Sequence, residues 1–78
     1  MIKYKKIYFD YFGYGEQDTI LCEVCEDPAV DIHHIKFKSR GGKDEIENEI
    51  ALCRRCHNKA HCYLISEKEL TRIHLKNL

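Results

Sequence analysis

The stretch from Asp31 to His61, DIHHIKFKSRGGKDEIENEIALCRRCHNKAH, decides the fold of this chain. It contains four of the five histidines and two of the five cysteines. Two more cysteines, Cys22 and Cys25, lie just before it in a C-x-x-C motif of their own. Thiolates and imidazoles are the ligands that zinc prefers in proteins. The sequence therefore predicts two metal sites in one small domain, one for folding and one for chemistry.

The length of the chain favours a fold that is stabilised by metal. We interpret its 78 residues as a single domain over 1–78, and so short a chain is rarely stable on packing alone. The first twelve residues, MIKYKKIYFDYF, lack the apolar core and cleavage site of a signal peptide. No stretch approaches the roughly 20 apolar residues of a membrane span. We therefore expect a cytoplasmic protein without a membrane partner, where thiols stay reduced and paired C-x-x-C motifs bind metal.

The two C-x-x-C motifs together predict a structural Zn²⁺ site. Its ligands are Cys22, Cys25, Cys53 and Cys56. Four thiolates have the number and softness that tetrahedral zinc prefers. The zinc would clamp the start of a histidine-bearing strand to the start of a histidine-bearing helix. The alternatives are two disulfides or four ordinary buried thiols, and we interpret the remaining Cys62 as a small apolar helix residue.

The sequence predicts a helix before the first cysteine pair. Apolar and aromatic residues from Tyr4 to Phe12 recur at steps of three and four, and Gly13 and Gly15 follow them. This spacing fits an amphipathic helix better than a strand. We expect its aromatic side chains to form part of the core rather than a platform for stacked bases.

A strand and a short helical turn are predicted between the cysteine pairs. Residues 29–35 alternate in the manner of a strand, which places His33 and His34 on opposite sides unless the strand bends. A glycine-containing loop follows. Asp44 is then positioned to cap a helical turn over residues 46–50.

Two further helices are predicted in the last part of the chain. Residues 54–63 contain few helix breakers, and a helix there brings His57 and His61 onto one face because they are four apart. Ser66 followed by Glu69 forms a capping box at the start of the last helix. The predicted apolar side of that helix consists of Leu70, Ile73 and Leu75.

The charge is balanced over the whole chain but not around the histidines. There are 13 basic and 13 acidic residues, so the formal net charge is zero. The basic residues that we expect to contact DNA phosphates are Lys36, Lys38, Arg40, Arg54, Arg55 and Lys59. A local basic rim can bind a phosphate backbone although the overall balance is neutral. The alternative is an ordinary solvated surface of mixed charge.

The order of the histidines suits phosphodiester hydrolysis. This reaction needs a base to deprotonate water and a divalent cation to absorb charge on the phosphoryl oxygens and the leaving group. An imidazole with its ordinary pKa near 6.5 suits the first task at neutral pH. Histidines four residues apart on a helix suit the second.

These motifs together resemble the HNH endonuclease family, in the variety with a four-cysteine zinc site. The resemblance is carried by C-E-V-C at 22–25, D-I-H-H-I at 31–35, G-G at 41–42 and N-E-I-A-L-C-R-R-C-H-N-K-A-H at 48–61. It covers half of the chain. It implies a small, zinc-stabilised α+β fold with a ββα-metal (His-Me finger) core, to which this chain adds flanking N- and C-terminal helices.

The resemblance also implies roles for particular residues. His34 is similar to the general base that activates water, and Asn48 is similar to the asparagine that orients the base or helps hold the ion. His33, His57 and His61 are similar to ligands of a catalytic divalent cation such as Mg²⁺ or Mn²⁺, the last of them present only in some members. The resemblance implies cleavage of DNA to a 5′-phosphate and a 3′-hydroxyl.

Each of these residues also has an ordinary structural explanation. A strand histidine can be a surface residue, Asn48 can be a helix cap, and His57 can support the zinc site. One departure from the family pattern is Glu49, where members often have leucine. We expect Glu49 and its neighbouring glutamates to face solvent. His74 lies outside every motif, and we expect it to face solvent as well.

The favoured hypothesis is a small nuclease that nicks or cuts DNA with little sequence preference, because no recognition element accompanies the motifs. We expect a monomer or weak dimer, in a phage or mobile-element setting and beside a packaging or restriction partner. One alternative is a non-catalytic zinc-binding module that contacts nucleic acid or protein. Another is that His33, His57 and His61 bind a second structural zinc with no open position.

Overall fold

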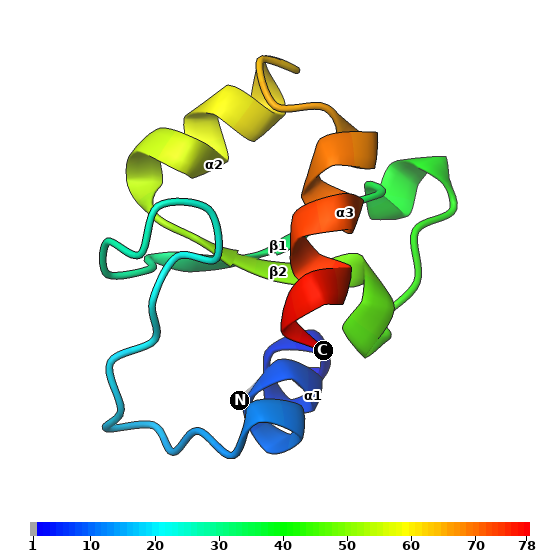
Figure 1. Cartoon of the computed structure of the whole chain (residues 1–78). Helices are drawn as coiled ribbons and strands as arrows, with labels where there is room; N and C mark the ends of the chain where they lie inside the picture. The colour runs from blue at the N-terminus through cyan, green and yellow to red at the C-terminus, as the bar shows by residue number, and fades with distance from the viewer. Residues whose placement is uncertain (1) are drawn as a thin grey trace.

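The fold is built from a two-stranded sheet and three α-helices (Figure 1). The computed structural model describes residues 2–78. Its elements are α1 (Lys3–Phe12), β1 (Asp31–His34), the 3-10 helices η1 (Lys38–Arg40) and η2 (Ile46–Asn48), β2 (Glu49–Leu52), α2 (Arg54–His61) and α3 (Glu67–Asn77). The predicted α+β class, with helices on both sides of the histidine-bearing segment, is confirmed.

The sheet pairs β1 with β2 in antiparallel register, which separates the two neighbouring histidines. His33 pairs with Ile50 and His34 pairs with Glu49. Successive side chains on a strand point to opposite faces. His33 and Ile50 therefore face α2, whereas His34 and Glu49 share the opposite face, on which Ile32 packs against α1.

Helix α1 covers the face of the sheet that carries Ile32. Its Tyr8 is buried and packs with Ile32 and Ala51. The helix ends as predicted, because Gly13 adopts φ 74°, a left-handed conformation that residues with a side chain avoid. Its aromatic residues are mostly core, although Tyr11 remains half exposed.

Helices α2 and α3 close the other face of the sheet over a second core. Its buried members are Cys22, Ile35, Ile50, Leu52, Cys53, Cys56, Ala60 and Leu70. The predicted capping of α3 is confirmed, since the Ser66 Oγ accepts a hydrogen bond from the Glu69 N–H at 3.1 Å. The predicted apolar side is correct for Leu70 and Ile73, but Leu75 is 52% exposed.

Several predicted element boundaries were wrong by one or more residues. The strand is shorter than 29–35, and the helix predicted over 54–63 ends at His61. The turn predicted over 46–50 ends at Asn48, because Ile50 pairs with His33 in the sheet. Asp44 does not cap that turn, because its carboxylate binds other side chains. Cys62 is exposed beyond the end of α2 rather than buried within it.

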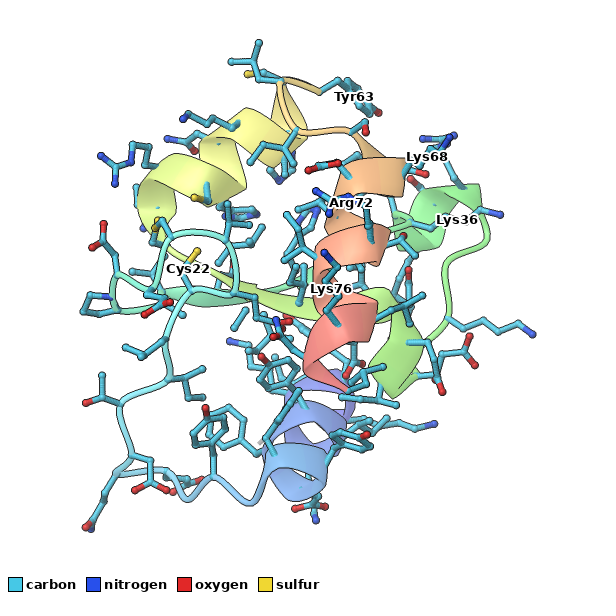
Figure 2. The ribbon with its side chains drawn as sticks, in the orientation of Figure 1. Cys22, Lys36, Tyr63, Lys68, Arg72 and Lys76 are labelled. Carbon is cyan, nitrogen blue, oxygen red and sulfur yellow. The ribbon has the colours of Figure 1, made fainter. Side chains whose placement is uncertain are left out.

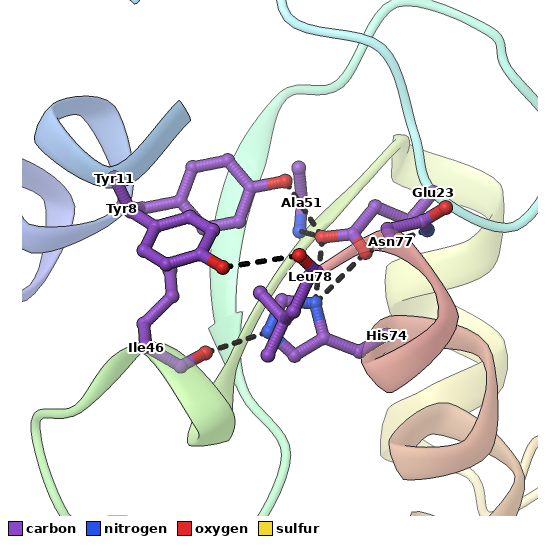
Figure 3. A network of polar contacts seen from close by, with 8 residues as sticks. All are labelled: Tyr8, Tyr11, Glu23, Ile46, Ala51, His74, Asn77 and Leu78. Atoms are coloured by element: carbon purple, nitrogen blue, oxygen red, sulfur yellow. Dashed lines mark hydrogen bonds and ion pairs between the residues drawn. The ribbon is translucent and has the colours of Figure 1, made fainter. Parts of the chain in front are cut away.

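A buried polar network ties α3 to the first cysteine turn (Figure 3). The Glu23 carboxylate accepts hydrogen bonds from the Tyr8 hydroxyl at 2.6 Å, from His74 Nδ1 at 2.8 Å and from Asn77 at 3.0 Å. His74 Nε2 lies 2.6 Å from the Ile46 carbonyl oxygen. The expectation that His74 faces solvent was therefore wrong, because its side chain is fully buried in this network.

Both ring nitrogens of His74 face acceptors, which favours the doubly protonated imidazolium. Burial opposes this charge, but the hydrogen bonds to Glu23 and to the Ile46 carbonyl raise the pKa of His74 above its ordinary value. The network joins segments far apart in sequence. It thereby holds the Cys22–Cys25 turn against α1, β2 and α3.

Across residues 2–78, no helix has the length and apolar character that crossing a membrane requires.

Candidate functional site

Four cysteines converge where the 22–25 turn meets the start of α2, and Figure 2 shows one of them, Cys22, near this helix. The Sγ of Cys25 lies 3.5 Å from that of Cys53 and 3.7 Å from that of Cys56. These distances exceed the roughly 2 Å of a disulfide. They match the separation of about 3.8 Å expected between sulfurs at 2.3 Å from a tetrahedral zinc. The donor set therefore fits zinc and excludes the disulfide alternative for these pairs.

Local structure already favours a thiolate at one of these cysteines. Cys53 is the N-cap of α2, and its Sγ accepts a hydrogen bond from the Cys56 N–H at 3.4 Å. This bond lowers the pKa of Cys53 to about 7. Thiols at helix N-termini ionise readily for this reason, and zinc binds the thiolate form.

Three histidines form a second group of possible metal ligands, beside the middle and the end of α2. His33 comes from β1, while His57 and His61 lie one turn apart on α2. One ring nitrogen of each lies within 4.8 Å of the others. The spacing of four residues on the helix and the period of two on the strand bring these side chains together, as predicted.

The environment of this cluster favours the neutral form of His33 and His57. Burial and the neighbouring His57 and His61 rings lower the pKa of His33 to about 4. Burial likewise lowers the pKa of His57. Neutral imidazole is the form that binds metal. Asp31 lies 3.7 Å from His57 Nδ1, where a carboxylate can orient a metal-binding ring.

His34 has a different set of partners. Its Nε2 lies 2.8 Å from Asp44 Oδ1, and the second oxygen of Asp44 accepts a hydrogen bond from Lys38 at 3.1 Å. The hydrogen bonds from His34 and Lys38 lower the pKa of Asp44. An ionised Asp44 accepts the hydrogen on Nε2 of His34, and in the neutral ring this tautomer leaves Nδ1 with a free lone pair. The Tyr4 ring packs against this imidazole at a centroid distance of 4.5 Å.

Asn48 holds the loop that carries Asp44. Its side-chain oxygen accepts from the Lys36 N–H at 2.8 Å, and its amide donates to the carbonyls of Lys36 and Lys43 at 3.1 Å. It does not cap η2, whose N-cap is Glu45. These contacts make Asn48 the organiser of the loop between β1 and β2. Gly42 allows the close passage of backbone that this arrangement needs, because a Cβ there would lie 1.8 Å from the Lys36 carbonyl oxygen.

His34 and the three-histidine cluster line the same pocket, although the side chains of His33 and His34 leave β1 on opposite faces. The pocket has a volume of about 410 Å³. Its lining includes His33, His34, His57 and His61, together with Tyr4, Asp31, Ile32, Phe37 and Lys38. His34 and His57 therefore reach a common space, as a combined base and metal site requires. Phe37 stacks on His61 at a centroid distance of 5.4 Å and forms part of the apolar wall.

The six basic residues expected to contact DNA are all exposed, but half of them are paired with carboxylates. The ion pairs are Lys38 with Asp44, Arg40 with Glu67 and Arg55 with Asp27. Figure 2 shows a further basic row on α3, which the sequence analysis did not consider. Lys68, Arg72 and Lys76 are four residues apart and share one exposed face of that helix.

Glu49, like His74, is buried although it was predicted to face solvent. It is fully buried rather than solvent-facing, and neither of its carboxylate oxygens has a hydrogen-bond partner among the described residues. One of its oxygens lies within 4.8 Å of both the His34 ring nitrogen and an Asp44 oxygen. No local sequence pattern indicated this burial, because it follows from the pairing of β1 with β2, in which Glu49 lies opposite His34.

Comparison with known proteins places these residues in a recognised family. A family model described as HNH endonuclease matches residues 22–62. The chain is also 34% identical, over 65 residues, to the type IV methyl-directed restriction enzyme EcoKMcrA of Escherichia coli strain K12. That alignment covers 70% of this chain but only 23% of the enzyme. No solved structure matches the chain.

Proposed function

Since the chain belongs to the HNH endonuclease family, we propose that it is a metal-dependent endonuclease that hydrolyses DNA phosphodiester bonds. The observation that carries this proposal is the shared pocket, in which His34 lies beside a cluster of three imidazoles. A base and a cation site within one small pocket are the two parts that hydrolysis of a phosphodiester requires. β1, β2 and α2 then form the ββα-metal core.

His34 is the proposed general base. Its Nδ1 removes a proton from water, the water oxygen attacks phosphorus, and the 3′ oxygen of the cleaved bond leaves. Asp44 holds the imidazole through Nε2 at 2.8 Å and stabilises the positive charge that the ring acquires. Asn48 acts as a positioning residue, because its three hydrogen bonds fix the loop that carries Asp44.

His33, His57 and His61 are the proposed ligands of the catalytic ion, such as Mg²⁺ or Mn²⁺. When bound, the ion supplies positive charge to the phosphoryl oxygens and the leaving oxygen. Three imidazoles are also a set that suits Zn²⁺, Co²⁺ or Ni²⁺ better than Mg²⁺. The exposure of His61 leaves the cluster open on one side, which favours a catalytic site over a closed structural zinc.

The four cysteines are the proposed structural zinc site. A zinc there fixes the distance between the start of α2 and the 22–25 turn, and so helps to hold His57 and His61 opposite His33. The zinc would therefore support the structure of the pocket and take no part in the reaction.

DNA is the proposed substrate, and basic residues around the pocket are its proposed phosphate contacts. Of the six, Lys36, Arg54 and Lys59 are exposed and have no ion pair among the described residues. A monomer or weak dimer with one site nicks one strand at a time. The similarity to part of a restriction enzyme favours a restriction or packaging partner that supplies recognition.

The test is cleavage of supercoiled plasmid by the zinc-loaded chain with added Mn²⁺ or Mg²⁺, run with the wild type and His34→Ala. We expect His34→Ala to lower the nicking rate by about 10²- to 10⁴-fold, because this is the usual contribution of a general base. Zinc content and far-UV circular dichroism should remain unchanged. Lys76→Ala, on the basic face of α3, serves as a matched surface control and should nick at the wild-type rate.

Equal nicking by the wild type and a correctly folded His34→Ala would reject the proposed base. No nicking by either protein with any divalent cation would favour the non-catalytic binding module instead.

A further inference from the structure

His34, Asp44 and Glu49 form a third group of possible metal ligands, distinct from the four cysteines and the three histidines. One ring nitrogen and one carboxylate oxygen from each acid lie within 4.8 Å of one another. The group lies on the α1 side of β1, whereas His33 points to the α2 side. No motif in the sequence analysis assigned this group, because Glu49 was expected to face solvent.

Glu49 is the residue that requires an explanation. Its side chain is fully buried, and neither oxygen has a hydrogen-bond partner among the described residues. A buried ionised carboxylate without a partner is costly, so such groups normally bind a proton, a cation or a hydrogen-bond donor. Burial and the nearby Asp44 carboxylate raise the pKa of Glu49 to about 7. Near neutral pH, a proton and a metal ion can therefore compete for it.

The positive groups nearby are already engaged. Lys38 donates to the far oxygen of Asp44 at 3.1 Å. The two ring nitrogens of His74 face Glu23 and the Ile46 carbonyl. Among the described residues, neither cation donates a hydrogen bond to Glu49, so the Glu49 carboxylate lies beside His34 and Asp44 without a positive partner of its own.

We propose that His34, Asp44 and Glu49 form a second site for a divalent transition-metal cation such as Mn²⁺ or Zn²⁺. One imidazole nitrogen and two carboxylate oxygens suit these ions. The ion would replace the hydrogen of the bond between His34 and Asp44, and it would give the orphaned Glu49 oxygen a partner. The side chains of His34 and Asp44 are 14% and 19% exposed, which provides a route for the ion from solvent.

The site has a regulatory consequence, which rests on the proposed function. An ion at this position would bind Nε2 of His34 and the Asp44 carboxylate, so the proposed base would lose the hydrogen bond to Asp44 that orients its ring. High concentrations of the cation then inhibit the nuclease that lower concentrations activate.

The binding test counts Mn²⁺ ions on the zinc-loaded chain by equilibrium dialysis and by electron paramagnetic resonance of free Mn²⁺. Mn²⁺ does not compete well for a four-thiolate zinc site, so it reports the other sites. We expect about two ions on the wild type and about one on Glu49→Leu. Removing the histidine cluster with His57→Ala and His61→Ala should also leave about one, and the triple variant about none.

Glu47→Gln is the matched control, because Glu47 is an exposed glutamate two residues away and lies outside the group. It should bind as many ions as the wild type. Asp44→Asn is a second probe of the same site, on a more exposed side chain, and it decides the question if Glu49→Leu does not fold. Equal Mn²⁺ binding by the wild type and a folded Glu49→Leu, or by the wild type and Asp44→Asn, overturns the proposal.

These outcomes are separate from the test of the nuclease. If the chain has no nuclease activity, the Glu49-dependent ion is still counted by binding. If activity is present, nicking by the wild type should fall at high Mn²⁺ or Zn²⁺, and nicking by Glu49→Leu should not. Inhibition of equal strength in both proteins would reject the regulatory role.

Discussion

Gly42 lies where the loop between the two strands passes close to its own backbone. A Cβ built at this position would come within 1.8 Å of the Lys36 carbonyl oxygen and 3.0 Å of the Asn48 side-chain amide. The Lys36 carbonyl is also an acceptor for Asn48. A single methyl group here therefore pushes against the backbone segment that Asn48 holds.

We predict that Gly42→Ala displaces the loop, destabilises the fold by about 1 to 3 kcal/mol as overpacking commonly does, and lowers the nicking rate because Asp44 no longer holds His34. Urea unfolding and the plasmid assay measure the two effects. Gly15→Ala is the matched control, since its Cβ would meet only the Asp18 side chain at 3.6 Å. If Gly42→Ala has the wild-type urea midpoint and the wild-type nicking rate, the loop does not pass as close to Gly42 as the structure indicates.

Glu49 makes the stability of the fold depend on pH. Its pKa is raised from 4.5 to about 7 in the folded state. The folded protein therefore holds this proton more tightly than the unfolded chain. The resulting stabilisation is fully present below the unfolded pKa and is lost as pH rises through about 7.

We predict that Glu49→Gln removes this dependence. Without added Mn²⁺, the free energy of unfolding of the wild type relative to Glu49→Gln should fall by up to about 3 kcal/mol between pH 5 and pH 8. Denaturant unfolding of the zinc-loaded proteins across this range measures it. For Glu47→Gln, at an exposed position, the difference in unfolding free energy from the wild type should stay constant across this pH range. If the difference between the wild type and Glu49→Gln also stays constant with pH, the Glu49 carboxyl is solvated or paired.

At the scale of elements, α2 combines the zinc site, the histidine cluster and an exposed basic side. The Cys53 Sγ caps its first turn by accepting a hydrogen bond from the Cys56 N–H, and its buried side packs through Cys56 and Ala60. Arg54 and Lys59 remain exposed on the same helix. This helix can therefore contact DNA phosphates while it presents His57 and His61 to the pocket.

We predict that Arg54→Ala and Lys59→Ala weaken DNA binding with little effect on the rate at saturating DNA. Each lost phosphate contact should reduce the slope of log affinity against log salt by about one. Nicking measured over a series of salt concentrations tests this. Lys76→Ala on α3 is the control and should keep the wild-type slope. An unchanged slope in both α2 variants would place the DNA elsewhere.

In the molecule as a whole, two small cores and the four-cysteine cluster hold the pocket together. Among the described residues, the core against α1 has only Tyr8, Ile32 and Ala51 as buried members. The other core includes three of the four clustered cysteines, Cys22, Cys53 and Cys56. Without a metal ion, no bond would hold these thiols together in the middle of that core.

We predict that removal of zinc by a strong chelator unfolds the chain cooperatively, because metal-binding energy is folding energy in small domains of this kind. Circular dichroism and zinc release should change together, and added Mg²⁺ should not restore the fold. Cys53→Ser should behave like the chelated wild type. Cys62→Ser is the matched control, because Cys62 is exposed and outside the cluster. A chelated chain that still melts cooperatively would show that packing alone is sufficient.

Residue type and local spacing were enough to predict the family, the ligand groups and the approximate positions of the helices. Two C-x-x-C motifs, a pair of histidines four apart and the Ser66 cap are each defined within a few residues. The environments of Glu49 and His74 depend instead on how the elements pack in three dimensions. His74 meets Glu23 across 51 positions in the chain, and Glu49 is buried where β2 meets elements distant in sequence. Burial and pairing of this kind arise from packing between elements, which local patterns do not encode.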